Sequence, residues 1–262
     1  MQLLCLSLVL MRCQPLRRAL CAQRRNMLHA ENGHIKQFFP LVSNVLEKGL
    51  IALQKGDKSY PATPIEAYAL NVFSRVSEID NAFKCIYLTL EYLGKKSYPD
   101  SEYDFSEHHA FHVENFLLRL TSVVDRCYLL VGSTLLMTDK KIEKLGGKKD
   151  VYKKIKDFSP ESAEILTKMN SKISELKKVR NKVAHQAGFS NQNLGVIKVI
   201  ENAESAAQVE SLTGIMSLDA LKEIVIDDSL EQFREVASVM DRLVSELIDS
   251  LAFVYSTLLE RT

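Results

Sequence analysis

The stretch TPIEAYALNVFSRVSEIDNAFKCIYLTLEYLG, residues 63–94, decides the fold class of this chain. Thr63 can cap a helix, Pro64 suits the first helical position, and Glu66 completes a capping box. Gly94 follows the last apolar position and ends the pattern. Between these signals apolar side chains recur at helical spacing, at Ala69, Phe73, Val76, Ile79, Phe83, Ile86, Tyr87 and Leu90. The stretch therefore predicts one long amphipathic helix that closes at Gly94.

The same period continues on both sides of this helix. Further helices are expected over residues 41–53, 106–137, 151–156, 159–186 and 229–254. Ser106 can cap the second of these, and Ser229 begins a second capping box at the start of the last. A short helix capped by Ser217 is expected before the last helix. Val196, Ile197, Val199 and Ile200 favour either a short strand or the start of a helix. The pattern predicts an all-α fold, an elaborated helical bundle of four long helices plus several short ones.

Composition and charge place the chain among soluble globular proteins. Its 262 residues are 46% hydrophobic, and no apolar run reaches the ~18 residues that span a bilayer. We therefore expect no membrane partner. Five cysteines without a CxxC pair fit a reducing compartment, so we expect a cytoplasmic protein.

Charge is strongly segregated along a chain whose net charge is only +1. Residues 140–182 hold 14 basic and 6 acidic side chains, whereas residues 201–249 hold 3 basic and 12 acidic ones. Such asymmetry favours a cationic face for an anionic partner, against which the acidic part could pack or compete. Two solvated helix surfaces would show the same pattern.

The first 26 residues differ from the remainder of the chain. They combine an apolar run with five arginines and contain no acidic residue, as a targeting segment often does. We expect residues 1–26 to be a disordered or targeting-like tail, with Met27 as an alternative start, and residues 35–262 to form one helical domain.

A six-residue string, Arg180-Asn181-Lys182-Val183-Ala184-His185, is the strongest functional feature. A guanidinium holds phosphate oxygens, and an imidazole moves a proton near neutral pH. Asn181 and His185 are four residues apart and so share one helix face, whereas Arg180 lies ~140° around the helix from His185. A helix that ends near His185, or a symmetric dimer with two copies of the string in one cleft, would bring these groups together. A structural role at a helix C-terminus is the alternative.

This string in an all-α chain resembles the signature of the HEPN superfamily, which is Arg, a polar residue that is often Asn, about three variable residues and His. The resemblance implies a helical bundle in a group with many metal-independent RNases of toxin–antitoxin, antiphage and RNA-processing systems, alongside members that only bind. It implies Arg180, Asn181 and His185 as catalytic residues, cleavage through the 2′-OH, and a homodimer, because this chain has one such string. An antitoxin or regulatory protein is a further implied partner. Asp125 and Glu114 are candidates for the acidic residue that some members add.

Lysines around the Gly146-Gly147 break suit contact with a phosphate backbone, which is electrostatic and not sequence-specific. The expected nucleic-acid-binding residues are Lys148, Lys149, Lys153, Lys177, Lys178 and Lys182. A solvated loop would have the same composition.

His108 and His112 are four apart, so a helix could present both imidazoles to one metal ion. No EExxH or HExxH string accompanies them, so we expect no metal and no other cofactor. Three functions therefore stay open: an RNA-cleaving homodimer, a non-catalytic HEPN-like module that binds RNA, nucleotide or protein, and a metal-holding bundle.

Overall fold

The computed structural model describes residues 28–57, 60–174, 176 and 192–260. Within these ranges the chain is helical and contains no strand, which confirms the predicted all-α fold. In chain order the elements are η1 (His29–Glu31), α2 (Gly33–Lys36), α3 (Phe39–Gln54), α4 (Pro64–Leu93), α5 (Phe105–Thr134), α6 (Asp139–Glu143), α7 (Gly147–Phe158), α8 (Pro160–Lys172), α10 (Gln192–Glu201), α11 (Ala206–Thr213), α12 (Leu218–Ser250) and α13 (Ala252–Leu259).

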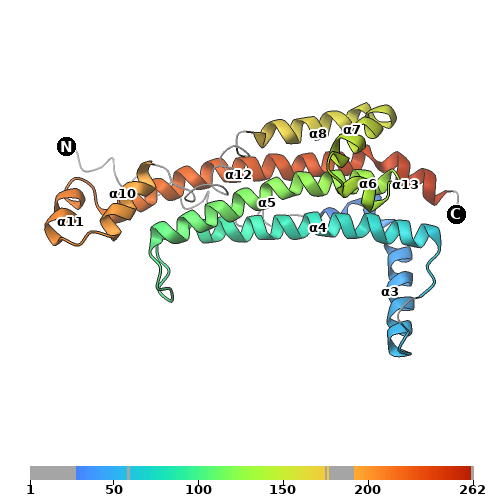
Figure 1. The fold of residues 1–262 in the computed structure, drawn as a ribbon, viewed down its shortest axis with the longest axis horizontal. Coiled ribbons are helices and arrows are strands. Elements are labelled where there is room, and N and C mark those ends of the chain that lie inside the picture. The colour runs from blue at the N-terminus through green and yellow to red at the C-terminus, as the bar shows by residue number, and fades with distance from the viewer. Residues whose placement is uncertain (1–27, 58–59, 175, 177–191, 261–262) are drawn as a thin grey trace, which may run out of the picture.

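Three long helices, α4, α5 and α12, lie side by side along the length of the molecule (Figure 1). The helices α4 and α5 form an antiparallel pair. Helix α8 packs along α12 and contacts α7, while α10 and α11 lie at the far end of α12. Helix α3 extends away from the bundle at the end where α13 lies (Figure 1). This arrangement buries one face of every long helix and leaves α3 largely outside the bundle.

The core is a continuous apolar layer between the long helices. Phe116 of α5 stacks on Phe233 of α12, with ring centroids 4.3 Å apart. At the α3 end, Phe38 packs edge-on against Tyr255 at 5.3 Å, and both rings are fully buried. Each such buried side chain stabilises the fold by about 1.5–3 kcal/mol.

Local capping signals explain where the first two long helices begin. Helix α4 starts with the predicted capping box, in which Thr63 accepts from the Glu66 backbone N–H and the Glu66 carboxylate accepts from the Thr63 N–H. Helix α5 begins with a capping box between Asp104 and Glu107. The prediction that Ser106 caps α5 is therefore wrong: Ser106 is already inside the helix and buried.

The prediction that Ser229 starts the last helix is also wrong. Ser217 caps α12, and this helix runs through Ser229 to Ser250 without interruption. Extending an existing helix costs far less than nucleating a new one, and Val225 and Leu230 continue the buried face across Ser229. Ser229 is consequently a core residue rather than a cap.

The structure tests two further predictions, both for residues between 159 and 201. Ser159 caps α8 as expected, but the helix is interrupted at Ile173, which leaves the helical conformation (φ −98°, ψ 1°) and is fully buried. The expected single helix from 159 to 186 is therefore wrong at Ile173, and residues 177–186 lie outside the described residues. The stretch around Val196, left open between strand and helix, lies in α10.

Candidate functional site

The predicted catalytic residues Arg180, Asn181 and His185 lie outside the described residues, as do Lys177, Lys178 and Lys182. The described chain on either side of them is well anchored. Leu176 and Leu194 are both buried, and the flanking helices α8 and α10 both pack against α12. The chain therefore enters and leaves the motif segment beside α12.

The other three predicted binding lysines, Lys148, Lys149 and Lys153, are exposed side chains of α7. This helix is amphipathic: Val151 and Ile155 are fully buried, and Lys149 and Lys153 occupy the opposite side. The glycine pair before it is a structural requirement. Gly146 has φ +86°, and a Cβ on Gly147 would lie 2.0 Å from the Ile142 carbonyl oxygen.

Ion pairs within this lysine cluster reduce its free positive charge. Lys148 Nζ lies 2.5 Å from Asp125 Oδ1, and Lys144 Nζ lies 2.6 Å from Asp150 Oδ2. Hydrogen bonding to Lys144 and its positive charge lower the pKa of Asp150. Among the described residues, no ion pair within 4.0 Å involves Lys149 or Lys153, although the charge of Lys153 also helps to lower the pKa of Asp150.

The two acidic candidates on α5 occupy different environments. Asp125 is engaged with Lys148, which joins α5 to α7. Glu114 is half-buried in the first half of α5. The structure does not bring these two carboxylates together, since they are 11 residues apart on one helix.

The histidine-rich start of α5 forms an aromatic stack with tyrosines from α4 and from the segment that follows it. His108 lies flat on Tyr98 with centroids 3.8 Å apart, and its Nε2 lies 2.7 Å from Ser101 Oγ. His112 stacks on Tyr92 at 5.1 Å. In the described part of the chain, no group of three or more His, Cys, Asp or Glu side chains has the arrangement of a metal site.

The neighbouring His109 is completely buried and faces α12. Its Nε2 lies 3.0 Å from the Ser229 hydroxyl oxygen, and its Nδ1 has no hydrogen-bond partner. Burial, together with the charge of His112, lowers the pKa of His109 to about 4. This imidazole is therefore neutral at physiological pH and joins α5 to α12.

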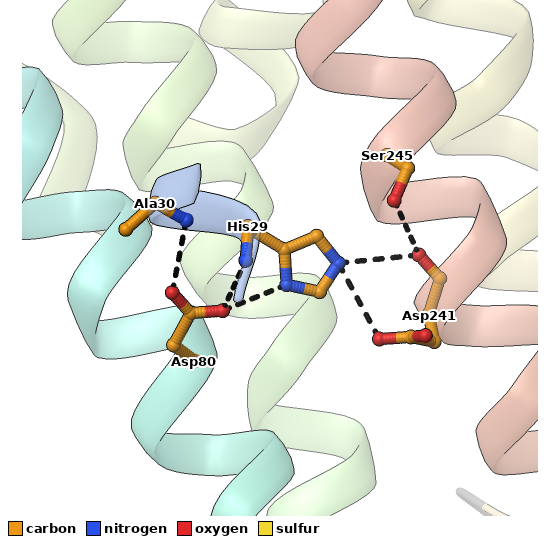
Figure 2. A network of polar contacts seen from close by, with 5 residues as sticks. All are labelled: His29, Ala30, Asp80, Asp241 and Ser245. Carbon is orange, nitrogen blue, oxygen red and sulfur yellow. Dashed lines mark hydrogen bonds and ion pairs between the residues drawn. The ribbon is translucent and has the colours of Figure 1, made fainter. Parts of the chain in front are cut away.

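A second buried histidine, His29, joins three elements that are distant in sequence (Figure 2). Its Nδ1 lies 2.8 Å from Asp80 Oδ1 on α4, and its Nε2 lies 3.4 Å from Asp241 Oδ1 on α12. Asp80 also accepts the backbone N–H groups of His29 and Ala30, at 2.8 and 3.0 Å. The sequence analysis did not single out this network; an aspartate inside an apolar helix face at position 80 is the signal that could have indicated it.

Charge and burial act in opposite directions within this network. Burial lowers the pKa of His29, but the hydrogen bond to Asp80 and the charge of Asp241 outweigh burial, so the pKa lies above its ordinary value of 6.5. Burial raises the pKa of Asp241 despite the nearby histidine. The contacts of His29 with Asp80 and Asp241 therefore favour the protonated imidazole, and they join η1, α4 and α12, a structural role for which no substrate access is needed.

An open hollow lies between α10 and α11, in the part of the chain that follows the motif segment. Its volume is about 970 Å³. Its polar lining includes Lys198, Asn202 and Gln208.

Among described helices, none combines the length and apolar character needed to cross a bilayer.

These features define the chain as an all-α protein of the long-helix-bundle type. Residues 67–252 match the family model described as HEPN_Cthe2314-like HEPN, so the chain belongs to the HEPN family. No match was found among curated proteins or among solved structures. The matched range contains Arg180, Asn181 and His185 and ends within α13.

Proposed function

We propose that this protein is a metal-independent endoribonuclease that acts as a homodimer in the cytoplasm. The observation that carries the proposal is the Arg180-Asn181-x-x-x-His185 string inside the range that matches the HEPN family. An arginine can hold phosphate oxygens and a histidine can transfer a proton near neutral pH, so this pair suits phosphodiester cleavage through a ribose 2′-OH.

The chemistry needs a base, an acid and a source of positive charge. His185 takes the proton of the 2′-OH, and the 2′-oxygen bonds to phosphorus while the bond from phosphorus to the 5′-oxygen breaks. A protonated imidazole, the partner's His185, gives a proton to the leaving 5′-oxygen. The products are a 2′,3′-cyclic phosphate and a 5′-hydroxyl. Arg180 stabilises the charge on the phosphoryl oxygens, and Asn181 orients the reacting groups.

Two copies of the chain are required because each supplies one string. Lys148, Lys149 and Lys153 on α7, with Lys177, Lys178 and Lys182 beside the motif, supply the positive charge that attracts the RNA backbone. The acidic helix α12, against which both flanking helices pack, is a competing surface of opposite charge. An antitoxin or regulatory protein that covers the string would silence the enzyme.

The test is incubation of the purified full chain with mixed single-stranded RNA in EDTA. Wild type is expected to produce fragments with 2′,3′-cyclic phosphate ends. His185→Ala and Arg180→Ala are each expected to reduce the cleavage rate by at least about 100-fold while the circular dichroism spectrum is unchanged.

His34→Ala is the matched control, because His34 is an exposed histidine on α2 far from the motif in sequence. Its cleavage rate should equal that of wild type. RNA that is retained on the protein but not cleaved would instead identify a non-catalytic HEPN-like binding module and defeat the nuclease proposal.

A further inference from the structure

A small hollow lies where the end of α5, the end of α7 and helix α13 meet, and its volume is about 280 Å³. These elements lie at the opposite end of the bundle from α10 and α11 (Figure 1). The lining is mainly apolar, and three of its large side chains, Leu136, Phe158 and Phe253, are 64%, 60% and 47% exposed. Exposed apolar side chains gathered around a hollow are typical of a binding site.

Hydrogen bonds within the bundle fix the floor of this hollow. Thr134 is fully buried, and its hydroxyl oxygen lies 3.3 Å from the hydroxyl oxygen of Tyr255. The carbonyl oxygen of Thr134 accepts from the Tyr68 hydroxyl, also at 3.3 Å. The side-chain and carbonyl oxygens of Thr134 are thus occupied, so the floor is held in place before any ligand enters and offers the ligand apolar contact.

One side of the hollow carries a positive charge that no carboxylate balances. Among the described residues that line it, Lys154 is the one charged side chain. Its ammonium group donates to the Leu135 carbonyl oxygen at 2.8 Å, and in the described part of the chain no ion pair within 4.0 Å involves it. An ammonium group has three N–H donors, so two are left for a ligand. The hollow therefore suits a molecule with an anionic head and an apolar body.

Leu136, at the edge of the hollow, has a backbone conformation that leucine disfavours. Among the non-glycine residues that the structure describes, it alone has a positive φ, at 55°. It closes α5: its N–H donates to Ser133, and the N–H of Met137 donates to Gly132, at 3.0 and 2.9 Å. A glycine would fill this position without strain. Because the leucine side chain is largely exposed, neither the helix end nor the core requires it, whereas contact with a ligand would.

We propose that this hollow binds a medium-chain aliphatic carboxylate, with the carboxylate at Lys154 and the hydrocarbon between Leu136, Phe158 and Phe253. At ~30 Å³ for each water-sized group, 280 Å³ holds about nine such groups, which sets the length of the chain. The contact between carboxylate and ammonium is charge-assisted, and it selects an anion over a cation of the same length. This site goes beyond the proposed ribonuclease function and does not depend on it.

The test is isothermal titration calorimetry of the full chain with sodium octanoate. Wild type is expected to bind octanoate with a Kd of about 1 mM, and octylammonium at least about tenfold more weakly, because the latter brings a second positive charge to Lys154. Lys154→Gln should weaken octanoate binding by at least about tenfold and abolish the preference for the anion.

Leu136→Gly separates binding from folding. It should weaken octanoate binding by at least about fivefold, because apolar contact is lost. Its midpoint of thermal unfolding should nevertheless stay within about 3 °C of wild type, because glycine relieves the strained φ. Lys156→Gln is the matched control for charge, since Lys156 is an exposed lysine of α7 outside the lining, and it should bind octanoate as wild type does.

Four results would overturn the inference. Octanoate does not bind at about 10 mM, octylammonium binds as tightly as octanoate, or either Lys154→Gln or Leu136→Gly keeps the wild-type affinity. The fourth is loss of octanoate binding at protein concentrations where sedimentation shows self-association, since the hollow is then an interface between copies. Because the titration contains no RNA, its result is the same whether or not the protein is a ribonuclease.

Discussion

At the scale of single residues, His29 makes the fold sensitive to pH. Its pKa is raised in the folded state, so protonation of His29 stabilises the protein fully below the ordinary value of 6.5. That contribution is lost as the pH rises through the raised folded-state pKa. We expect the free energy of unfolding, measured with urea, to fall over this range by at most about 1.4 kcal/mol per pH unit.

His29→Gln should remove most of this pH dependence. It should also lower the free energy of unfolding at pH 6 by about 2 kcal/mol or more, because Asp80 and Asp241 lose a buried charged partner. His34→Gln, a change of the same kind at an exposed position, should leave both quantities unchanged. An unaltered pH profile in His29→Gln would show that the imidazole is neutral in the folded protein.

At the scale of helices, Glu66 both begins α4 and attaches α3 to it. Its Oε1 accepts from Asn44 at 2.5 Å and from Lys48 at 2.7 Å, while Oε2 accepts from the Thr63 backbone at 2.8 Å. The hydrogen bond from Lys48, followed by that from Thr63, lowers the pKa of Glu66 to about 2. The contribution of Glu66 to stability is therefore present above the ordinary pKa of 4.5 and is lost as the pH falls through about 2.

Glu66→Ala is expected to loosen α3 selectively. Hydrogen exchange at pH 7 should be at least about tenfold faster for the backbone amides of α3 than in wild type, because a charge-assisted contact is lost. Amides in the middle of α5 should change much less. The control is Glu78→Ala, which removes only an ion pair within α4, in which Arg75 Nη1 lies 3.4 Å from Glu78 Oε2. This change should leave hydrogen exchange in α3 unaffected. If the α3 amides exchange at the same rate in Glu66→Ala and in wild type, the buried apolar face of α3 alone holds this helix on the bundle.

The helices also show which parts of the fold could be predicted from the sequence. The bounds of α4 agree with the sequence pattern because Thr63, Glu66 and Gly94 act within a few residues of the ends that they determine. Ser229 has the same local signals but lies inside α12, because a helix already started at Ser217 extends through it. Local signals therefore identify a helix start only where no helix is already in progress.

At the scale of the whole molecule, the contacts that could not be predicted join residues far apart in the chain. His29 and Asp241 are 212 residues apart, and His109 and Ser229 are 120 apart. Periodicity indicates that a face is buried but not which helix covers it. The proposed motif is read from sequence because its residue types and spacing are local, whereas the proposed cleft between two copies depends on contacts that no single sequence states.

The segregated charge of the whole molecule predicts which helix RNA binds. Helix α7 holds five lysines and two aspartates, whereas α12 holds three basic and nine acidic residues. Under the proposed function, α7 is the surface that attracts the RNA backbone and α12 the surface that repels it. Since Lys148 is paired with Asp125, Lys149 and Lys153 are the α7 side chains expected to release counterions on binding.

Lys149→Gln with Lys153→Gln should therefore weaken binding of single-stranded RNA and reduce the slope of log affinity against log salt by about 1.4, or ~0.7 for each lost phosphate contact. Fluorescence anisotropy with the His185→Ala protein measures binding while cleavage is absent. Lys36→Gln with Lys84→Gln removes the same charge from α2 and α4, so it should leave the slope unchanged if the contact is local. Equal loss of slope in both double variants would show that RNA responds to net charge alone, and that α7 is a solvated surface rather than a binding site.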